Sequence, residues 1–188
     1  MQRVVYLSRQ EAESLTPEPG AAIISISDSI SYPAKLSDQF AHIKRMYFLD
    51  GVYGEESIIQ FGPNFTIAFH NFFRKPHAEE IIAFLQSFDI TAVTTLYVHC
   101  KAGESRSAAV AKYISEYFHI PAYRLQFGTL NQEHEFLKAN ALVYQLLCNP
   151  TCFDQLINFN NPGHLKNRDT SWSSLSSLQK IKFKMFNY

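Results

Sequence analysis

A cysteine and an arginine, separated by five residues, stand in the middle of the chain in the stretch VHCKAGESRSAAV. His99 precedes Cys100, and Ser107 follows Arg106. The run VTTLYVH before Cys100 predicts a buried strand, and RSAAVAKYISEYF predicts a helix, so the intervening loop joins a strand end to a helix start. The free amides of a helix N-terminus bind anions, and a guanidinium can hold two oxygens of one phosphate. The spacing therefore predicts a phosphate-binding loop.

The same loop favours an ionised cysteine. A free thiol has a pKa of about 8.5, which a helix N-terminus and a nearby cation lower. Cys100 is therefore predicted to be a thiolate that attacks a bound phosphate monoester and forms a cysteinyl-phosphate intermediate. Ser107 can donate a hydrogen bond to the sulfur, His99 can orient the loop and tune the thiol, and Gly103 allows a tight curve. The alternative is a buried thiol at a strand end, which leaves these neighbours unexplained.

The stretch resembles the signature of the cysteine-dependent protein tyrosine phosphatases. That signature is His-Cys-x5-Arg-Ser/Thr, and HCKAGESRS matches it in full. The AG…SRS core is similar to the small bacterial and dual-specificity branch, and the likeness extends from about Ile23 to Phe118. It implies a phosphate-binding loop made of Lys101, Ala102, Gly103, Glu104, Ser105 and Arg106. Because a carboxylate repels phosphate, the side chain of Glu104 is expected to point outward, to solvent or to a basic group of the substrate.

The leaving alcohol needs a proton, which in the resembling family comes from an aspartate on a movable loop. No aspartate occurs from Gly51 to Phe88, so Asp50, after the predicted strand Ile43–Leu49, is expected to be the acid and then the base. Its alternative is a turn residue without chemistry. The reserve candidates are Glu55 and Glu56, and Asp28 is expected to be structural.

Strands and helices alternate through most of the chain. This alternation predicts an α/β fold of three layers, with a mainly parallel central sheet flanked by helices, and the resemblance implies a protein tyrosine phosphatase-like arrangement. In such sheets ligands bind beyond the carboxyl ends of the strands. The remaining predicted strands are Val4–Ser8 and Ala21–Asp28, and the remaining helices are one capped by Ser8 with Glu11, His77–Phe88 and Glu135–Cys148.

The segment from Gly51 to Lys75 has no clear hydrophobic period. We interpret it either as a functional loop or as short helical turns packed by their own aromatic residues. The phenylalanines Phe65, Phe69, Phe72 and Phe73 are expected to pack in the core rather than to line a phosphotyrosine site. Tyr53 is a candidate for stacking on a substrate ring.

The composition is that of a globular protein, with 188 residues, 46% hydrophobic, 18% charged and a formal net charge of zero. It argues against an extended nucleic-acid surface, and no apolar run reaches membrane-spanning length, so a cytoplasmic protein is expected. Residues 1–149 are expected to form the phosphatase domain, and 150–188 an appendage that is partly ordered or packed on it. Cys148 and Cys152 are interpreted as structural thiols, with a local bridge or a metal pair as the alternatives.

The sequence therefore predicts hydrolysis of phosphate monoesters, with phosphotyrosine in proteins or peptides as the expected substrate. Phosphate, sulfate or vanadate is expected to bind in the loop, and the chemistry needs no metal or cofactor. Two alternatives stay open. One is a phosphoinositide, a nucleotide or an RNA 5′-phosphate as the substrate, and the other is a phosphate-binding module that has lost turnover.

Overall fold

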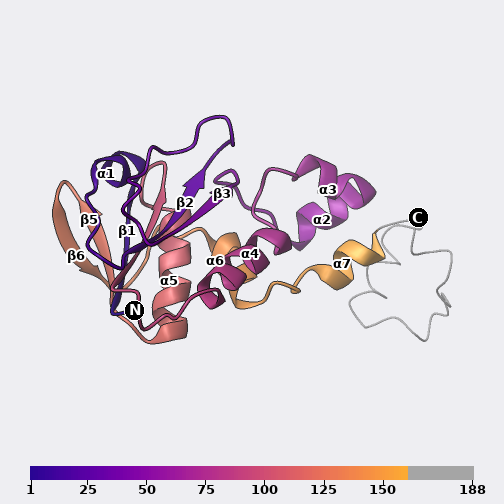
Figure 1. The fold of residues 1–188 in the computed structure, drawn as a ribbon. Helices are drawn as coiled ribbons and strands as arrows, with labels where there is room; N and C mark the ends of the chain where they lie inside the picture. The colour runs from indigo at the N-terminus through magenta and orange to yellow at the C-terminus, as the bar shows by residue number, and fades with distance from the viewer. Residues whose placement is uncertain (161–188) are drawn as a thin grey trace, which may run out of the picture.

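A six-stranded sheet forms the centre of the molecule in the computed structural model, which describes residues 1–160 (Figure 1). The strand order is β3-β2-β4-β1-β5-β6, and every neighbouring pair is parallel except β5 with β6. The predicted α/β fold with a mainly parallel sheet is thereby confirmed. The strands are β1 (Arg3–Ser8), β2 (Ala22–Ser27), β3 (His42–Tyr47), β4 (Thr95–Cys100), β5 (Ala122–Gln126) and β6 (Thr129–Glu133).

Helices flank the sheet on both faces. The larger core lies between one face and the helices α4 (Lys75–Gln86), α5 (Arg106–Phe118) and α6 (Ala141–Cys148). The smaller core lies on the other face, where Ala12 of α1 (Arg9–Ser14) packs near Val5 and Leu7. Because both faces are covered, every residue of β2 and β4 is buried, and both strands are mainly apolar in sequence.

The strands predicted before residue 100 are confirmed to within two residues at their ends. The predicted cap of the first helix is also confirmed. Ser8 Oγ accepts from the backbone of Glu11, and the Glu11 carboxylate accepts from the backbone of Ser8. Helix α5 has the predicted bounds, and Tyr117 near its end is 61% exposed.

The helix predicted for Glu135–Cys148 is wrong in its first half. Residues 134–140 run without helical structure, Phe136 has a φ of 50°, and α6 begins only after Asn140. The Asn140 side chain caps α6, because its Oδ1 accepts from the Val143 backbone N–H at 3.1 Å. The antiparallel hairpin of β5 and β6 was not predicted.

Short helical turns occupy the segment after Asp50, as one of the two interpretations expected. They are α2 (Glu55–Phe61), the 3-10 turn Gly62–Asn64 and α3 (Phe65–Ala68). Tyr53 is only 8% exposed and packs against Phe65 and Phe69, with ring centroids 4.9 and 5.5 Å away. Its expected role in stacking on a substrate ring is therefore wrong, since the ring is committed to this aromatic cluster.

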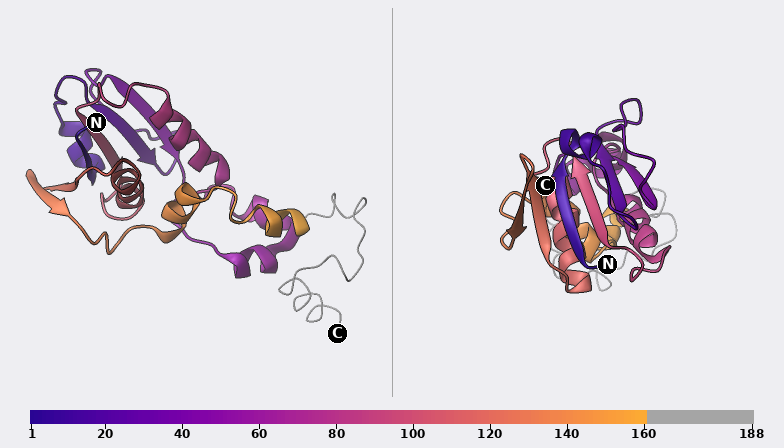
Figure 2. Two further views of the ribbon diagram at one scale, coloured as in Figure 1. Left: turned by 90° about the horizontal axis from the view of Figure 1, so that it is seen from below. Right: turned by 60° about the vertical axis from the view of Figure 1, so that its left-hand side comes forward.

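Helix α7 (Asp154–Phe159) lies beside α2 and α3, and together they extend away from the sheet (Figures 1 and 2). Phe153 packs on Tyr53 at 5.6 Å, and Lys75 Nζ binds Asp154 Oδ2 at 2.6 Å. Residues 150–160 of the expected appendage thus pack on the helices before them. Its remainder, 161–188, lies outside the described residues.

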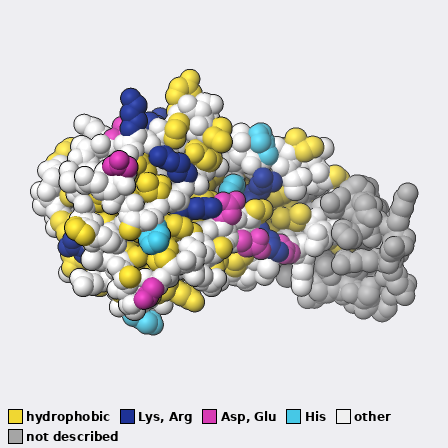
Figure 3. Space-filling model, viewed as in Figure 1, with side chains coloured by type: hydrophobic (Ala, Val, Ile, Leu, Met, Phe, Trp, Pro, Cys, Tyr) yellow, Lys and Arg dark blue, Asp and Glu magenta, His cyan; other side chains and the backbone are white. Residues whose placement is uncertain are grey.

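The surface in view in Figure 3 carries basic and acidic side chains interspersed with each other, without a single large basic patch. Among residues 1–160, no helix is long and apolar enough to cross a membrane.

Candidate active site

The carboxyl ends of β1, β2, β3 and β4 meet at one edge of the sheet, and the candidate site lies there. Cys100 is the last residue of β4, and Arg106 is the first residue of α5. Register places Cys100 beside Ser8 of β1 and His99 beside Ser25 of β2. The structure therefore brings the predicted cysteine loop to the edge at which parallel sheets bind ligands.

Gly103 lets this loop rest directly on the end of β1. Its φ is +66°, and a Cβ at this position would lie 2.4 Å from the Leu7 carbonyl carbon and from the Ser8 nitrogen. Both contacts are with backbone atoms, which could shift only at a considerable cost in free energy. The Arg9 backbone N–H also donates to the Lys101 carbonyl at 3.4 Å. Glycine is therefore required here both by the backbone conformation and by the close approach.

The Cys100 thiol lies at the floor of the loop and is 1% exposed. Burial acts to raise the pKa of the Cys100 thiol, but hydrogen bonds from Ser107 and from the Glu104 backbone, with the charge of Arg106, outweigh it. The resulting pKa lies below the ordinary value of a thiol. Ser107 Oγ lies 3.2 Å from the sulfur, as a donor to a thiolate would. The surroundings of Cys100 therefore favour negative charge.

His99 lies behind the cysteine and is fully buried. Its Nε2 is 2.7 Å from the Ser25 hydroxyl on the neighbouring strand β2. Burial lowers the pKa of His99 to about 4, so the imidazole is neutral at neutral pH. His99 therefore supports the loop from inside the sheet without adding a charge near the thiol.

Arg106 is 2% exposed and is held by one end of its guanidinium. Its Nη1 donates to the Phe48 carbonyl at 2.6 Å and pairs with Asp28 Oδ1 at 2.7 Å. Its Nε is buried and has no hydrogen-bond partner among residues 1–160. A buried N–H donor without a partner is destabilising, so the Nε edge is the part of Arg106 suited to an added anion. Asp28, expected to be structural, holds this arginine in place.

Asp50 lies against the loop, although fifty positions separate it from Cys100 in the chain. Its Oδ1 accepts hydrogen bonds from Ser105 Oγ at 2.7 Å and from Asn140 Nδ2 at 2.9 Å. Its Oδ2 is 4.0 Å from Arg106 Nε. The structure therefore brings together Cys100, Arg106 and Asp50. Glu55 and Glu56, the reserve candidates, are exposed in the first turn of α2.

Glu104 points away from the cradle of the loop. Its carboxylate binds Arg124 Nη2 at 2.7 Å and Lys138 Nζ at 3.1 Å, and these two hydrogen bonds lower the pKa of Glu104. The outward direction agrees with the expectation, but the basic groups belong to this chain rather than to a substrate. The two cations offset a charge that would oppose a phosphate.

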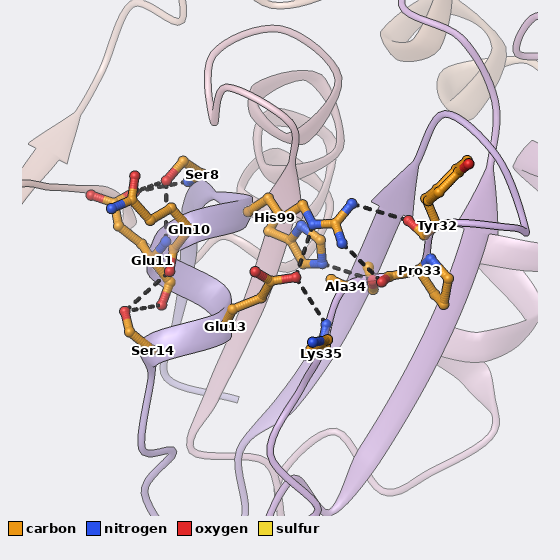
Figure 4. A network of polar contacts seen from close by, with 12 residues as sticks. Ser8, Gln10, Glu11, Glu13, Ser14, Tyr32, Pro33, Ala34, Lys35 and His99 are labelled. Carbon is orange, nitrogen blue, oxygen red and sulfur yellow. Dashed lines mark hydrogen bonds and ion pairs between the residues drawn. The ribbon is translucent and has the colours of Figure 1, made fainter.

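A polar network around α1 ties the β2–β3 connection to the same edge (Figure 4). The guanidinium of Arg9 donates to the carbonyls of Tyr32 and Pro33 at 3.0 and 2.9 Å and pairs with Glu13 at 2.8 Å. Glu13 in turn accepts from the Lys35 backbone at 3.0 Å. This network fixes the connection that begins at Asp28, the partner of Arg106.

Sequence reasoning missed Asn140, Arg124 and Lys138. Asn140 carried a readable signal, since an asparagine before the apolar run ALVYQLL is typical of a helix cap. The partners of Glu104 carried none, because they come from the unpredicted hairpin and from the stretch misread as helix. Cys148 and Cys152 are free cysteines, and residues 1–160 hold no cluster of three or more side chains suited to a metal ion.

Comparison of the chain with protein-family models, with curated proteins and with solved structures found no match.

Proposed function

We propose that this protein hydrolyses phosphate monoesters through a cysteinyl-phosphate intermediate, as the protein tyrosine phosphatases do. One observation carries the proposal. A buried thiol with a lowered pKa lies beside a buried guanidinium whose Nε has no hydrogen-bond partner within residues 1–160. Both features favour a bound anion, which the Cys100 thiolate would attack.

In the first step, the backbone amides of Lys101–Arg106 and the Nε edge of Arg106 hold the phosphoryl oxygens. The Cys100 thiolate attacks phosphorus, the S–P bond forms, and the bond from phosphorus to the ester oxygen breaks. Asp50 gives its proton to the departing oxygen, which leaves as an alcohol or a phenol.

In the second step, a water molecule attacks phosphorus while the Asp50 carboxylate takes its proton. The O–P bond forms and the S–P bond breaks, so that inorganic phosphate and the Cys100 thiolate are released. The hydrogen bond from Ser107 stabilises the sulfur as it regains negative charge.

Phosphotyrosine in a protein or peptide is the proposed substrate, on the strength of the signature resemblance. The formal net charge of zero favours a protein substrate over RNA or an anionic lipid surface, both of which attract clustered basic residues. Turnover of phosphotyrosine and phosphoserine peptides, inositol phosphates and RNA 5′ ends, compared at equal concentration, would distinguish these substrate classes.

The decisive experiment replaces the nucleophile. Cys100→Ser should abolish turnover of 4-nitrophenyl phosphate and keep the binding of inorganic phosphate, because the amides and Arg106 remain. Rapid acid quenching of the wild type should trap phosphate on Cys100. The matched control is Cys148→Ser, at an exposed free cysteine, which should retain full activity. Turnover in Cys100→Ser at the wild-type rate would exclude the covalent mechanism.

A further inference from the structure

Asn140 joins three segments of the candidate site and is 6% exposed. Its Nδ2 donates to Asp50 Oδ1 at 2.9 Å and to the Gly51 carbonyl at 3.2 Å. Its Oδ1 caps α6 through Val143, and its backbone N–H donates to the Ser105 carbonyl at 3.1 Å. One buried residue thus connects the segment after β3 and the start of α6 through its side chain, and the phosphate-binding loop through its backbone.

The helix cap fixes which way the amide of Asn140 faces. The backbone N–H of Val143 can only donate, so the amide atom that meets it must be the oxygen. The Nδ2 group is then obliged to point toward Asp50 and Gly51. Asp50 therefore receives a hydrogen-bond donor whose direction is set by the backbone of α6.

Ser105 Oγ donates to the same carboxylate oxygen, at 2.7 Å. With two donors on Oδ1, the other oxygen of Asp50 is the one left to carry a proton. That oxygen, Oδ2, lies 4.0 Å from Arg106 Nε, at the edge of the guanidinium that suits an anion.

We propose that Asn140 is a positioning residue, which orients Asp50 so that Oδ2 delivers the proton to the leaving oxygen. The inference rests on the proposed phosphatase function. It assigns the acid–base reaction to one atom of Asp50 and gives α6 a role in holding that atom. A residue that only capped α6 would contribute to stability and would leave proton transfer unchanged.

Two substitutions separate the two roles, because Asp and Ser are both good helix caps. Asn140→Asp and Asn140→Ser keep the acceptor for Val143 and remove the Nδ2 donor. The readout is kcat/KM for phenyl phosphate, whose leaving group needs the proton, against kcat/KM for 4-nitrophenyl phosphate, whose leaving group needs it less. This ratio excludes the hydrolysis of the cysteinyl-phosphate, which is common to both substrates. We expect a loss of about tenfold to a hundredfold on phenyl phosphate and a much smaller loss on 4-nitrophenyl phosphate.

Phosphate binding gives a second readout. The affinity for inorganic phosphate should stay within about threefold of the wild type in Asn140→Ser, because the phosphate-binding amides and Arg106 are unchanged.

The control variant is Asn131→Ser, at an exposed position of β6, which should keep the wild-type ratio of the two rates. Equal losses on both substrates in the Asn140 variants, or no loss, would overturn the assignment. If Asn140→Ser does not fold, the isosteric Asn140→Asp decides the matter. Absence of a cysteinyl-phosphate in the wild type would overturn the proposed function itself, which is a distinguishable result.

Discussion

Charge is unevenly distributed around Arg106. Asp28 and Asp50 both lie near this one buried cation, and ionisation of the Cys100 thiol, whose pKa is lowered, would add a further negative charge. An incoming phosphate therefore depends on the loop amides as well as on Arg106, and it is bound better when Asp50 carries a proton. Binding of the phosphate and protonation of the acid should accordingly be coupled.

Asp50→Asn tests that coupling. Asparagine can keep the hydrogen bonds to Ser105 and Asn140 through its oxygen, but it has no proton to deliver. We expect turnover of phenyl phosphate to fall by about two orders of magnitude, and inorganic phosphate to bind more tightly because a negative charge is removed. Steady-state kinetics and calorimetry measure the two effects. Asp38→Asn, at an exposed site, should change neither, and an unchanged rate in Asp50→Asn would remove Asp50 from the acid role.

His99 makes the stability of the fold depend on pH. Its folded pKa of about 4 lies below the ordinary value of 6.5, so between these values only the unfolded chain binds a proton at this residue. Stability therefore rises with pH across that window and is lost as pH falls through it. We expect His99 to account for a loss of about 2 kcal/mol from pH 7 to pH 5.

Urea unfolding at several pH values measures this loss. From pH 7 to pH 5, His99→Gln should lose about 2 kcal/mol less free energy of unfolding than the wild type, whatever the stability of the variant at pH 7. If the free energy of unfolding changed equally with pH in the two proteins, His99 would be shown to become protonated without unfolding of the chain.

At the scale of elements, the phosphate-binding loop depends on the end of β1. A side chain at position 103 would collide with the backbone at Leu7 and Ser8. Gly103→Ala should lower the free energy of unfolding by about 1 to 3 kcal/mol. It should also raise the pKa of the Cys100 thiol, because a displaced loop withdraws its amides from the sulfur.

Chemical denaturation and the pH dependence of alkylation of Cys100 would detect these effects. Gly54→Ala is the matched control, since a Cβ there meets nothing within 4 Å. Equal behaviour of the two variants would contradict the proposed dependence of the loop on β1.

The elements that build the floor of the site could be predicted from the sequence, because their signals are local. The strand β4 is a short and mainly apolar run, α5 begins six residues after its end, and the capping box of α1 lies within four residues, Ser8 to Glu11. The expectation that Asp50 serves the site depended on the resemblance and on the absence of other aspartates nearby. The structure places its carboxylate beside Arg106.

The rest depended on distant contacts. Leu137 stands four residues before Ala141, the spacing of one helix face, and Phe136 is its apolar neighbour. Phe136 nevertheless has a positive φ and Leu137 is 86% exposed, so their apolar character did not report helical packing. The tertiary partners of Glu104 and Arg106 could not be read from a pattern, because sequence spacing does not reveal which side chains meet across loops. Asn140 is intermediate, since its capping role was readable and its contact with Asp50 was not.

At the scale of the whole molecule, α7 is part of the folded unit formed with α2 and α3. Phe153 is 5% exposed and packs on Tyr53. Phe153→Ala should lower the global free energy of unfolding by about 3 kcal/mol and retain a single transition. Phe127→Ala, at a residue that is 91% exposed, should change stability by less than about 0.5 kcal/mol. An unaffected transition in Phe153→Ala would mean that this segment is separate from the fold.

The hydrogen bond between Ser105 and Asp50 has a consequence for which step limits the rate of turnover. The carboxylate is bound to the loop Lys101–Arg106 through Ser105 Oγ, at 2.7 Å. On the proposed mechanism, Asp50 would then need no large closing movement to reach the substrate, unlike the acid of an enzyme whose lid movement limits the rate. Raising the viscosity of the medium with sucrose should lower kcat/KM for a good substrate and leave kcat nearly constant.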